Sequence, residues 1–514
     1  MHEKRPVMIV GAGPTGLTAA MELSRFKIPV RLVDRYKEPS NTSRALAVQS
    51  RTLELFFQRG LTDEMLRLGN KGLFTTIYGN GKKLGSVDLK YIDSRFNYVL
   101  LLAQSETERI LREQLARQGV NVERETEMVA FSQDEGRGAG GVRVALRKAD
   151  GSLEEVEAAY LIDSEGAHST VRHTLNVPFK GKSLQHSYAL ADLHLEGDVP
   201  ENQLSVFLSE NGLLAAFPMG NHRFRVIATE KDEVALDAPD PDLAYMHELF
   251  RRGSHIPVRF YDMVWSSRFR INSRMIGCLK AQRIFFGGDS AHVHSPAGGQ
   301  GMNTGIQDMI NLGWKLALVY KGVAKPKLLD TYDPERMPII RSLVSTTETA
   351  TDLFNADSSF VQNLMTHALP IALSFQAVQK KGAGIVSELR GNYRDSPLTV
   401  PHDGSGGLRS GDRAPDIRVG GHGSGDTLLS LLDPSRFTLF MVEDAPNLDE
   451  LPQWAEGWNV KRISAPSELE DANTFRAALG SSRWLLVRPD GYLLWTSSQG
   501  DSAAVRQWCS TWLA

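Results

Sequence analysis

Residues 7–16 read VMIVGAGPTG, and residues 17–34 continue as LTAAMELSRFKIPVRLVD. The apolar run 7–10 is typical of a buried parallel strand, and a second apolar run at 30–33 ends at Asp34. Between them, apolar residues recur with helical spacing after the glycines. The stretch therefore predicts strand, helix and strand in about thirty residues, which is how a doubly wound α/β domain of the Rossmann type begins.

The glycines of this stretch form a G-x-G-x-x-G motif between the first strand and the helix. Gly11 permits a tight turn, Gly13 lets the backbone approach a pyrophosphate, and Gly16 lets helix and strand pack closely. Asp34, which Arg35 follows, stands where a carboxylate can accept hydrogen bonds from a ribose. The Walker lysine of nucleotide hydrolases is absent. We expect a dinucleotide to be bordered by Gly11, Gly13, Pro14, Thr15, Gly16, Asp34 and Arg35.

A second glycine-rich stretch, GGDSAH at 287–292, follows the apolar run 284–286 and continues as PAGGQGMN at 296–303 into a long helical pattern. Asp289 at the end of a strand can hold a polyol chain, and the start of the helix offers a positive end to a negatively charged ring. Glycine backbone can also pass close to a flat ring. The residues that we expect at this second contact are Asp289, Pro296, Gly299, Gly301, Met302 and Asn303.

Composition limits the classes of protein that remain. The 514 residues carry 58 Lys+Arg against 61 Asp+Glu, so no overall charge favours nucleic acid or an anionic membrane. Two cysteines build neither a disulfide framework nor a four-cysteine zinc site, and His292 and His294 lack a third ligand, so no metal is expected. Without a secretory segment or a run of about 20 apolar residues, we expect a cytoplasmic protein.

The pattern of apolar and polar residues changes along the chain and divides it into segments. Residues 1–175 and 272–345 have an α/β pattern and are predicted to form the dinucleotide-binding domain, whereas 176–271 alternate as in an antiparallel sheet. Residues 346–400 are predicted to be a helical connector. Residues 401–514 follow a linker rich in proline and glycine and are predicted to be a compact α/β module.

The two glycine motifs, the segment around 165–172 and the run 296–311 together resemble the FAD-dependent aromatic hydroxylases, the class A flavoprotein monooxygenases. The resemblance implies an inserted antiparallel sheet that covers the flavin, and NADPH or NADH as reductant. It also implies transfer of one oxygen atom of O2 to an aromatic substrate through a flavin C4a-hydroperoxide. In this family Asp289 would contact the ribitol, and Pro296 would lie beside the reactive edge of the flavin ring.

Three further positions follow from the resemblance. Gln104 matches the helix that meets the phosphate–ribitol region, and Arg44 matches an arginine that can pair with the pyrophosphate. Glu165 stands where the family usually has aspartate, in a motif associated with both FAD and NAD(P)H binding. We expect the longer carboxylate to keep the acceptor role.

The substrate side is less defined by the sequence. Aromatic and apolar residues of the predicted sheet could enclose a ring, although alternating aromatics in a sheet are usually core residues. The candidates are Phe207, Phe217, Pro218, Met219 and Trp265. The sequence singles out no residue as the base that takes a phenol proton, and the candidate is His186.

Two other functions remain open at this point. The same scaffold could carry a Baeyer–Villiger or decarboxylating oxygenase, or a non-catalytic FAD- or ligand-binding protein. The last hundred residues resemble the thioredoxin-like extension of the larger hydroxylases but hold only Cys509, so thiol redox chemistry is not expected of them. We expect this domain to have a structural or oligomeric role, and a homodimer is compatible with that.

Overall fold

The structure is a computed structural model, and it describes most of the chain. The described residues are 5–39, 45–133, 140–209, 212–230, 238–295, 298–354, 371–401, 407–423, 425–443, 445, 457–500 and 502–514, except for the side chains of 184–186 and 350–354. Arg44, Pro296 and the side chain of His186 therefore lie outside the described residues.

The stretch 7–34 forms the centre of a six-stranded sheet. Strand β1 pairs in parallel with β2 on one side and with β12 on the other, as expected for a doubly wound domain. The sheet has the order β18-β19-β12-β1-β2-β8, and only β18 is antiparallel to its neighbour. Its strands are β1 (Val7–Val10), β2 (Val30–Val33), β8 (Val122–Glu123), β12 (Tyr160–Asp163), β18 (Lys280–Ala281) and β19 (Ile284–Phe286).

Three helices pack together beside this sheet, with α1 (Pro14–Arg25) between α4 (Gln104–Arg117) and α7 (Gly301–Tyr320). Helix α7 is buried along most of its length, with apolar residues in the core and buried polar residues such as Asp308 and Lys315 held by ion pairs. A three-stranded meander shares the same core and consists of β9 (Glu127–Gln133), β10 (Val142–Arg147) and β11 (Leu153–Ala158). The short helix α5 (Thr170–Thr174) follows β12.

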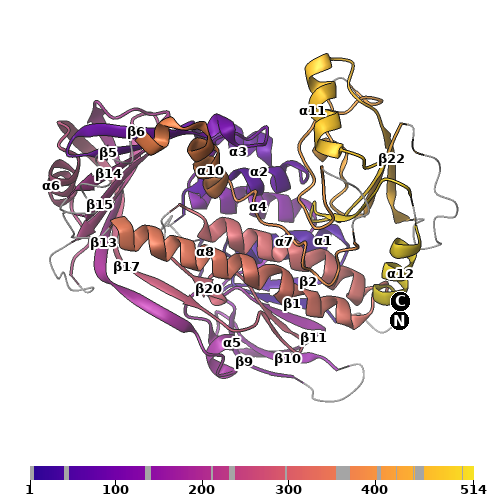
Figure 1. The fold of residues 1–514 in the computed structure, drawn as a ribbon. Coiled ribbons are helices and arrows are strands. Elements are labelled where there is room, and N and C mark those ends of the chain that lie inside the picture. The colour runs from indigo at the N-terminus through magenta and orange to yellow at the C-terminus, as the bar shows by residue number, and fades with distance from the viewer. Residues whose placement is uncertain are drawn as a thin grey trace.

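An eight-stranded sheet forms the second large layer, and Figure 1 shows it standing beside the helices of the first domain. Helix α6 (Leu243–Ser254) covers one face of it. Its order is β20-β17-β13-β16-β15-β14-β5-β6, antiparallel except for β14 and β5. The strands are β5 (Phe74–Gly79), β6 (Lys82–Asp88), β13 (Lys180–Gly197), β14 (Gln203–Ser209), β15 (Gly212–Gly220), β16 (Arg223–Glu230), β17 (Val258–Met275) and β20 (His292–Val293).

This sheet is larger than the segment 176–271 predicts. Strands β5 and β6 come from the part of the chain assigned to the dinucleotide-binding domain, and β20 comes from the second glycine motif. The sheet is thus tied to both parts of the first domain. The domain ranges themselves stay a prediction. The structure adds that three strands from the first domain's ranges belong to the eight-stranded sheet.

Several smaller elements connect the two large sheets. A three-stranded sheet has the order β3-β7-β4, and α8 continues past residue 345 into the predicted connector. These elements are β3 (Ala47–Val48), α2 (Ser50–Phe57), α3 (Thr62–Leu68), β4 (Asn70–Gly72), η1 (Leu89–Tyr91), β7 (Val99–Leu101), η2 (Gly288–Ser290), η3 (Pro326–Thr331), α8 (Tyr332–Phe354) and α10 (Gln376–Val386).

The C-terminal module is built on a mixed four-stranded sheet of order β22-β21-β23-β24, in which only β21 and β22 are parallel. Figure 1 shows it beside helix α7, with α11 on its outer side. Its elements are η4 (Leu429–Leu431), β21 (Thr438–Val442), β22 (Asn459–Ile463), α11 (Leu469–Leu479), β23 (Trp484–Val487), β24 (Leu493–Ser497) and α12 (Ala503–Trp512). Cys509 is buried in α12.

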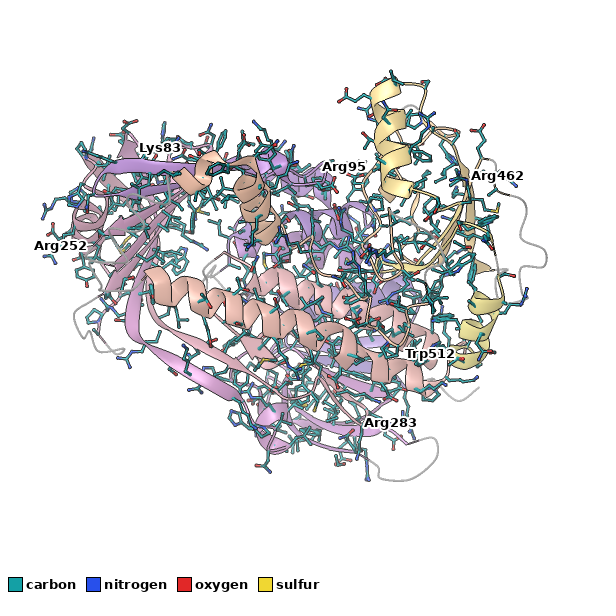
Figure 2. The ribbon with its side chains drawn as sticks, viewed as in Figure 1. Lys83, Arg95, Arg252, Arg283, Arg462 and Trp512 are labelled. Atoms are coloured by element: carbon teal, nitrogen blue, oxygen red, sulfur yellow. The ribbon has the colours of Figure 1, made fainter. Side chains whose placement is uncertain are left out.

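Ion pairs hold this module against the rest of the chain. Arg95, labelled in Figure 2 on the side that faces the module, donates to Asp416 at 2.8 Å. Arg413 of the module donates in return to Glu54 of α2 at 2.7 Å, and the Glu54 side chain is fully buried. A charge pair that is removed from water contributes more than an exposed one when its geometry is good.

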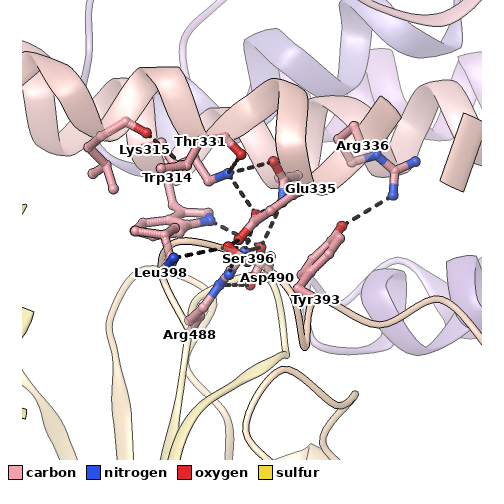
Figure 3. A network of polar contacts seen from close by, with 12 residues as sticks. Trp314, Lys315, Thr331, Glu335, Arg336, Tyr393, Ser396, Leu398, Arg488 and Asp490 are labelled. Carbon is pink, nitrogen blue, oxygen red and sulfur yellow. Dashed lines mark hydrogen bonds and ion pairs between the residues drawn. The ribbon is translucent and has the colours of Figure 1, made fainter. Parts of the chain in front are cut away.

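A buried polar network lies at the centre of the contact (Figure 3). Arg488 of the turn after β23 donates to both carboxylate oxygens of Glu335 in α8, at 2.6 and 2.8 Å. Lys315 of α7 donates to the same carboxylate at 2.7 Å, and Trp314 donates to Asp490 at 3.1 Å. The module is therefore joined to the first domain through matched, buried charges, which hold one docked geometry.

The α/β fold class predicted from the sequence, with an antiparallel sheet and a C-terminal α/β module, is confirmed. Within the described ranges, the helices are too short or too polar to cross a lipid bilayer.

Candidate active site

A single cavity of about 520 Å³ brings the two glycine motifs together. It opens at the carboxyl ends of β1, β2, β12 and β19, where open α/β sheets bind their ligands, and extends to one face of the eight-stranded sheet. Expected cofactor residues in its lining are Gly11, Gly13, Pro14, Thr15, Asp34, Gln104, Glu165, Asp289, Gly299, Gly301 and Met302.

The first motif forms a turn that only glycine can build. Gly11 has a φ of +97°, and a Cβ added there would lie 2.3 Å from the carbonyl oxygen of Ser164. Gly16 does not line the cavity, because it packs against the backbone of Gly11. Gly13 differs from both: it caps α1, and no atom lies within 4 Å of the place where its Cβ would be. The backbone is thus open to a phosphate at Gly13, beside the positive end of α1.

The second motif touches the first directly. Gly288 has a φ of +60°, and a Cβ added there would come within 2.3 Å of the hydroxyl oxygen of Thr15. A buried chain of contacts fixes this turn: Gly288 N–H donates to Asp308 at 3.2 Å, and Asp308 is also held by His292 and Arg336, each at 2.7 Å. The two helix starts, of α1 and α7, therefore face one space.

The loop before α7 is clamped onto strand β3. Gln49 donates from its side-chain amide to the carbonyl of Gly298 at 2.7 Å, and its backbone N–H donates to Asn303 at 2.9 Å. Asn303 donates in turn to the carbonyl oxygens of Ala47 and Gly299, both at 2.9 Å. Asn303 thus supports the loop from behind and is not part of the cavity lining.

Asp34 and Gln104 hold neighbouring backbone while they line the cavity. One carboxylate oxygen of Asp34 accepts from Ala12 N–H at 2.8 Å, so it braces the first turn. Gln104 accepts from Ala45 N–H at 3.0 Å and donates to Glu108 at 2.8 Å. Arg35 is outside the lining, and its guanidinium donates to the hydroxyl of Tyr36 at 2.9 Å.

The other end of the cavity is formed by one face of the eight-stranded sheet. Side chains alternate along a strand, so residues two apart share this face: Leu204 and Val206 of β14, and Arg225 and Ile227 of β16. Phe217 is the sequence candidate in this lining. The face is mainly apolar, and it can bury an aromatic ring system away from water.

The other substrate candidates have different positions. Phe207 lies on the opposite face from Val206, packed between Tyr78 and Phe250 of α6, so the register of β14 places it in the core. Trp265 packs in a cluster beside Phe217, and Pro218 and Met219 are likewise outside the cavity lining.

Polar atoms without a partner test whether the cavity suits FAD. Among the described residues, Gln49, Thr75 and His294 line the cavity, and their atoms Oε1, Oγ1 and Nε2 are buried and lack a hydrogen-bond partner. Buried polar atoms normally have a partner, so each indicates a polar group of a bound molecule. With the open backbone of Gly13 and two helix N-termini, the donor and acceptor set fits a dinucleotide with a polar ring.

Two family models match the chain: the FAD binding domain over residues 4–347, and the aromatic-ring hydroxylase C-terminal domain over residues 408–514. The chain belongs to the FAD-dependent aromatic-ring hydroxylases. The family, the FAD cofactor and the monooxygenase activity with NAD(P)H as reductant, all predicted from the sequence, are thereby confirmed.

Individual relatives of this hydroxylase agree over nearly their full length. The 6-methylpretetramide 4-monooxygenase of Streptomyces rimosus is 35% identical over 512 residues, which cover 95% of this chain and 90% of the relative. The solved structure of OxyS anhydrotetracycline hydroxylase from Streptomyces rimosus matches with a TM-score of 0.80 and 28% identity over 99% of both chains. CabE, an aromatic hydroxylase from angucycline biosynthesis, matches with a TM-score of 0.79 and 29% identity over 98% of this chain and 99% of its own.

Glu165, where the hydroxylase departs from the usual aspartate, caps helix α5. One of its carboxylate oxygens accepts from the N–H groups of Thr170 and Val171 at 3.0 and 3.2 Å. Burial, followed by the charge of Glu165, raises the pKa of nearby Asp163 to about 7. The longer side chain therefore reaches a helix N-terminus, and its predicted role toward FAD or NAD(P)H stays a prediction.

Arg225 and His294 are among the cavity residues of the hydroxylase that were not named as site candidates from the sequence. Arg225 is buried, pairs with Asp192 at 2.7 Å and donates to the carbonyl of Ala45 at 3.1 Å, so it joins the sheet to the segment before β3. The sequence feature that could have pointed to Arg225 is a charged residue on the buried face of β16. His294 was weighed as a metal ligand and rejected, and the family resemblance placed it in a flavin loop without giving it a role. In the described part of the chain, no group of three His, Cys, Asp or Glu residues could hold a metal ion.

Proposed function

We propose that this monooxygenase hydroxylates a polycyclic aromatic substrate that carries phenolic hydroxyl groups. The observation that carries the proposal is the continuity of the cavity, which runs from two helix N-termini to an apolar sheet face. The relatives reported above are named for 6-methylpretetramide and anhydrotetracycline, and this supports a substrate of several rings.

The residues that we propose to hold FAD lie at the first end of the cavity. The Gly11–Thr15 turn and the start of α1 would bind the pyrophosphate, with Asp34 at a ribose and Asp289 at the ribitol. When bound, FAD accepts a hydride from NADPH or NADH and activates O2 for transfer of one oxygen atom. The start of α7 would place its positive end at the ring and stabilise negative charge there.

The sheet residues have a different task in this proposal. Leu204, Val206, Phe217 and Ile227 would exclude water from the reacting atoms and hold the substrate plane against the ring. Arg225 would keep this wall in register with the cofactor side through its bond to Ala45. None of these side chains supplies electrons; they position the reactants.

The test uses the purified holoenzyme with NADPH and NADH in turn. Naphthols, hydroxyanthraquinones and four-ring phenols are added, and NAD(P)H oxidation, O2 uptake and product mass are recorded with isotopically labelled O2. We expect the larger phenols to stimulate oxidation and to gain one labelled oxygen on an intact ring. A ring-opened product would instead favour the Baeyer–Villiger alternative, and the absence of any stimulation would favour a non-catalytic flavoprotein.

A cytoplasmic location, a homodimer and a structural role of the C-terminal module are also proposals. The buried network around Arg488 and Glu335 supports the structural role, since it gives the module a fixed docking site. Light scattering coupled to gel filtration would decide the oligomeric state, with twice the chain mass of 56.8 kDa expected for a dimer.

A further inference from the structure

His294 occupies the junction between the two ends of the cavity. It directly follows β20, the edge strand that pairs with β17 of the substrate sheet, and it precedes the Gly298–Gly299 loop at the cofactor end. It lines the cavity together with Gly301, and a Cβ added to Gly301 would lie 3.3 Å from its Nε2. The imidazole is thus placed where a substrate ring and a cofactor ring would meet.

The two ring nitrogens of His294 have different surroundings. Nδ1 lies 2.7 Å from the carbonyl oxygen of Ser295, which can only accept, so Nδ1 carries the hydrogen. Nε2 is then a bare acceptor, and it is buried without a hydrogen-bond partner among the described residues. Burial lowers the pKa of His294 to about 4, so the ring is neutral at neutral pH.

A buried acceptor of this kind costs free energy until a donor reaches it. On the basis of the proposed function, we propose that Nε2 of His294 accepts the hydrogen of a phenolic hydroxyl of the substrate. The hydrogen stays shared between the two atoms, and no covalent bond breaks. Withdrawal of the hydrogen from the phenol oxygen increases electron density in the ring, which favours attack on an electrophilic oxygen.

The location of His294 favours the substrate as the donor. Its backbone is an extension of the sheet that forms the substrate wall, whereas the cofactor loop is already clamped by Gln49 and Asn303. The nearby positive end of α7 also opposes an imidazolium there, which keeps Nε2 available as an acceptor.

The experiment compares a phenol with its methyl ether, which lacks the donor hydrogen. Dissociation constants of 2-naphthol and 2-methoxynaphthalene, and of 2-hydroxyanthraquinone and its methyl ether, are measured from the change in flavin absorbance. The proteins are wild type, His294→Leu, His294→Gln, which keeps an acceptor oxygen, and His222→Leu, a control on an exposed histidine. FAD affinity and thermal stability are recorded for each.

We expect wild type to prefer the phenol by about tenfold, the value of one buried hydrogen bond. His294→Leu should abolish this preference, and His294→Gln and His222→Leu should keep it. Should His294→Leu fail to fold, His294→Ala is tested by the same ratio of dissociation constants for the methyl ether and the phenol.

Two results would overturn the inference alone. One is an undiminished preference for the phenol in the apolar variant, and the other is weaker FAD binding with that preference intact, which would make the flavin the donor. Failure of every probe to bind wild type would overturn the inference together with the proposed function.

Discussion

Gly11 and Gly13 lie two residues apart in the first turn and have opposite surroundings. A methyl group at Gly11 would strike the Ser164 carbonyl, and its φ is positive, whereas Gly13 has a φ of −76° and open space beside it. We expect Gly11→Ala to destabilise the apoprotein by at least about 1–3 kcal/mol. Gly13→Ala should change the free energy of unfolding of the apoprotein by under about 0.5 kcal/mol. It should nevertheless weaken the binding of FAD.

Chemical unfolding of the apoproteins and FAD fluorescence titration separate these two effects. Unchanged FAD affinity in Gly13→Ala would show that no phosphate approaches this backbone, and the placement of the cofactor would have to be revised.

Glu388 gives a prediction for pH dependence. Its carboxyl is buried, accepts from Gln307 at 2.5 Å and has a pKa raised to about 8 by burial. The folded chain therefore holds a proton that the unfolded chain releases above about pH 4, so the free energy of unfolding falls as pH rises from about 4 to 8. Glu388→Gln removes this dependence. As pH rises from about 4 to 8, the free energy of unfolding of the variant should therefore increase relative to that of wild type, by at most about 1.4 kcal/mol per pH unit.

Urea unfolding of the two apoproteins below and above neutral pH measures the difference. Parallel pH profiles of wild type and variant would show that Glu388 is ionised in the fold.

The glycine turns could be predicted from sequence because a positive φ and a close approach each require glycine. Arg225 could not be recognised as a cavity residue in the same way, and His294 was placed in a flavin loop only through the family resemblance. His294 follows β20, which pairs with β17 of the substrate-side sheet, and Arg225 of β16 reaches the segment before β3 through its hydrogen bond to the Ala45 carbonyl. Such contacts join residues far apart in the chain, and no local pattern records them.

At the level of elements, β14 presents neighbouring residues to two different environments. Val206 lines the cavity, whereas Phe207 is in the core against α6. We expect Val206→Phe to raise the KM of the largest ring systems by about tenfold and to leave small phenols unaffected. Phe207→Ala should instead lower the free energy of unfolding by about 3–5 kcal/mol.

Steady-state kinetics on two sizes of substrate and chemical unfolding measure this pair. If Val206→Phe left the KM of both the large and the small substrates unchanged, the sheet face would not be the substrate wall.

The alternation in 176–271 predicted antiparallel strands. It did not predict the register that places Phe207 in the core. The aromatic looked like a ring-binding residue because period two fixes which residues share a face and leaves open which face is covered. Strands β5 and β6 were missed as members of this sheet for a related reason, since β5 pairs in parallel with β14, more than a hundred residues later.

For the whole molecule, the docked C-terminal module depends on Arg488. Without its guanidinium, the carboxylates of Glu335 and Asp490 would be buried with too few positive partners, although Lys315 remains. We expect Arg488→Met to lower the free energy of unfolding by about 3–5 kcal/mol. Arg506→Met, at an exposed position of α12, should change it by under about 0.5 kcal/mol.

The effect of Arg488→Met should extend to the cofactor. Glu335 is followed by Arg336, which holds Asp308, and Asp308 fixes the Gly288 turn at the proposed ribitol site. We therefore expect weaker FAD binding in Arg488→Met and unchanged binding in Arg506→Met, measured by fluorescence titration at a temperature where both stay folded. Equal FAD affinity in the two variants, combined with the loss of stability, would mean that the module only stabilises the fold and does not support the cofactor turn.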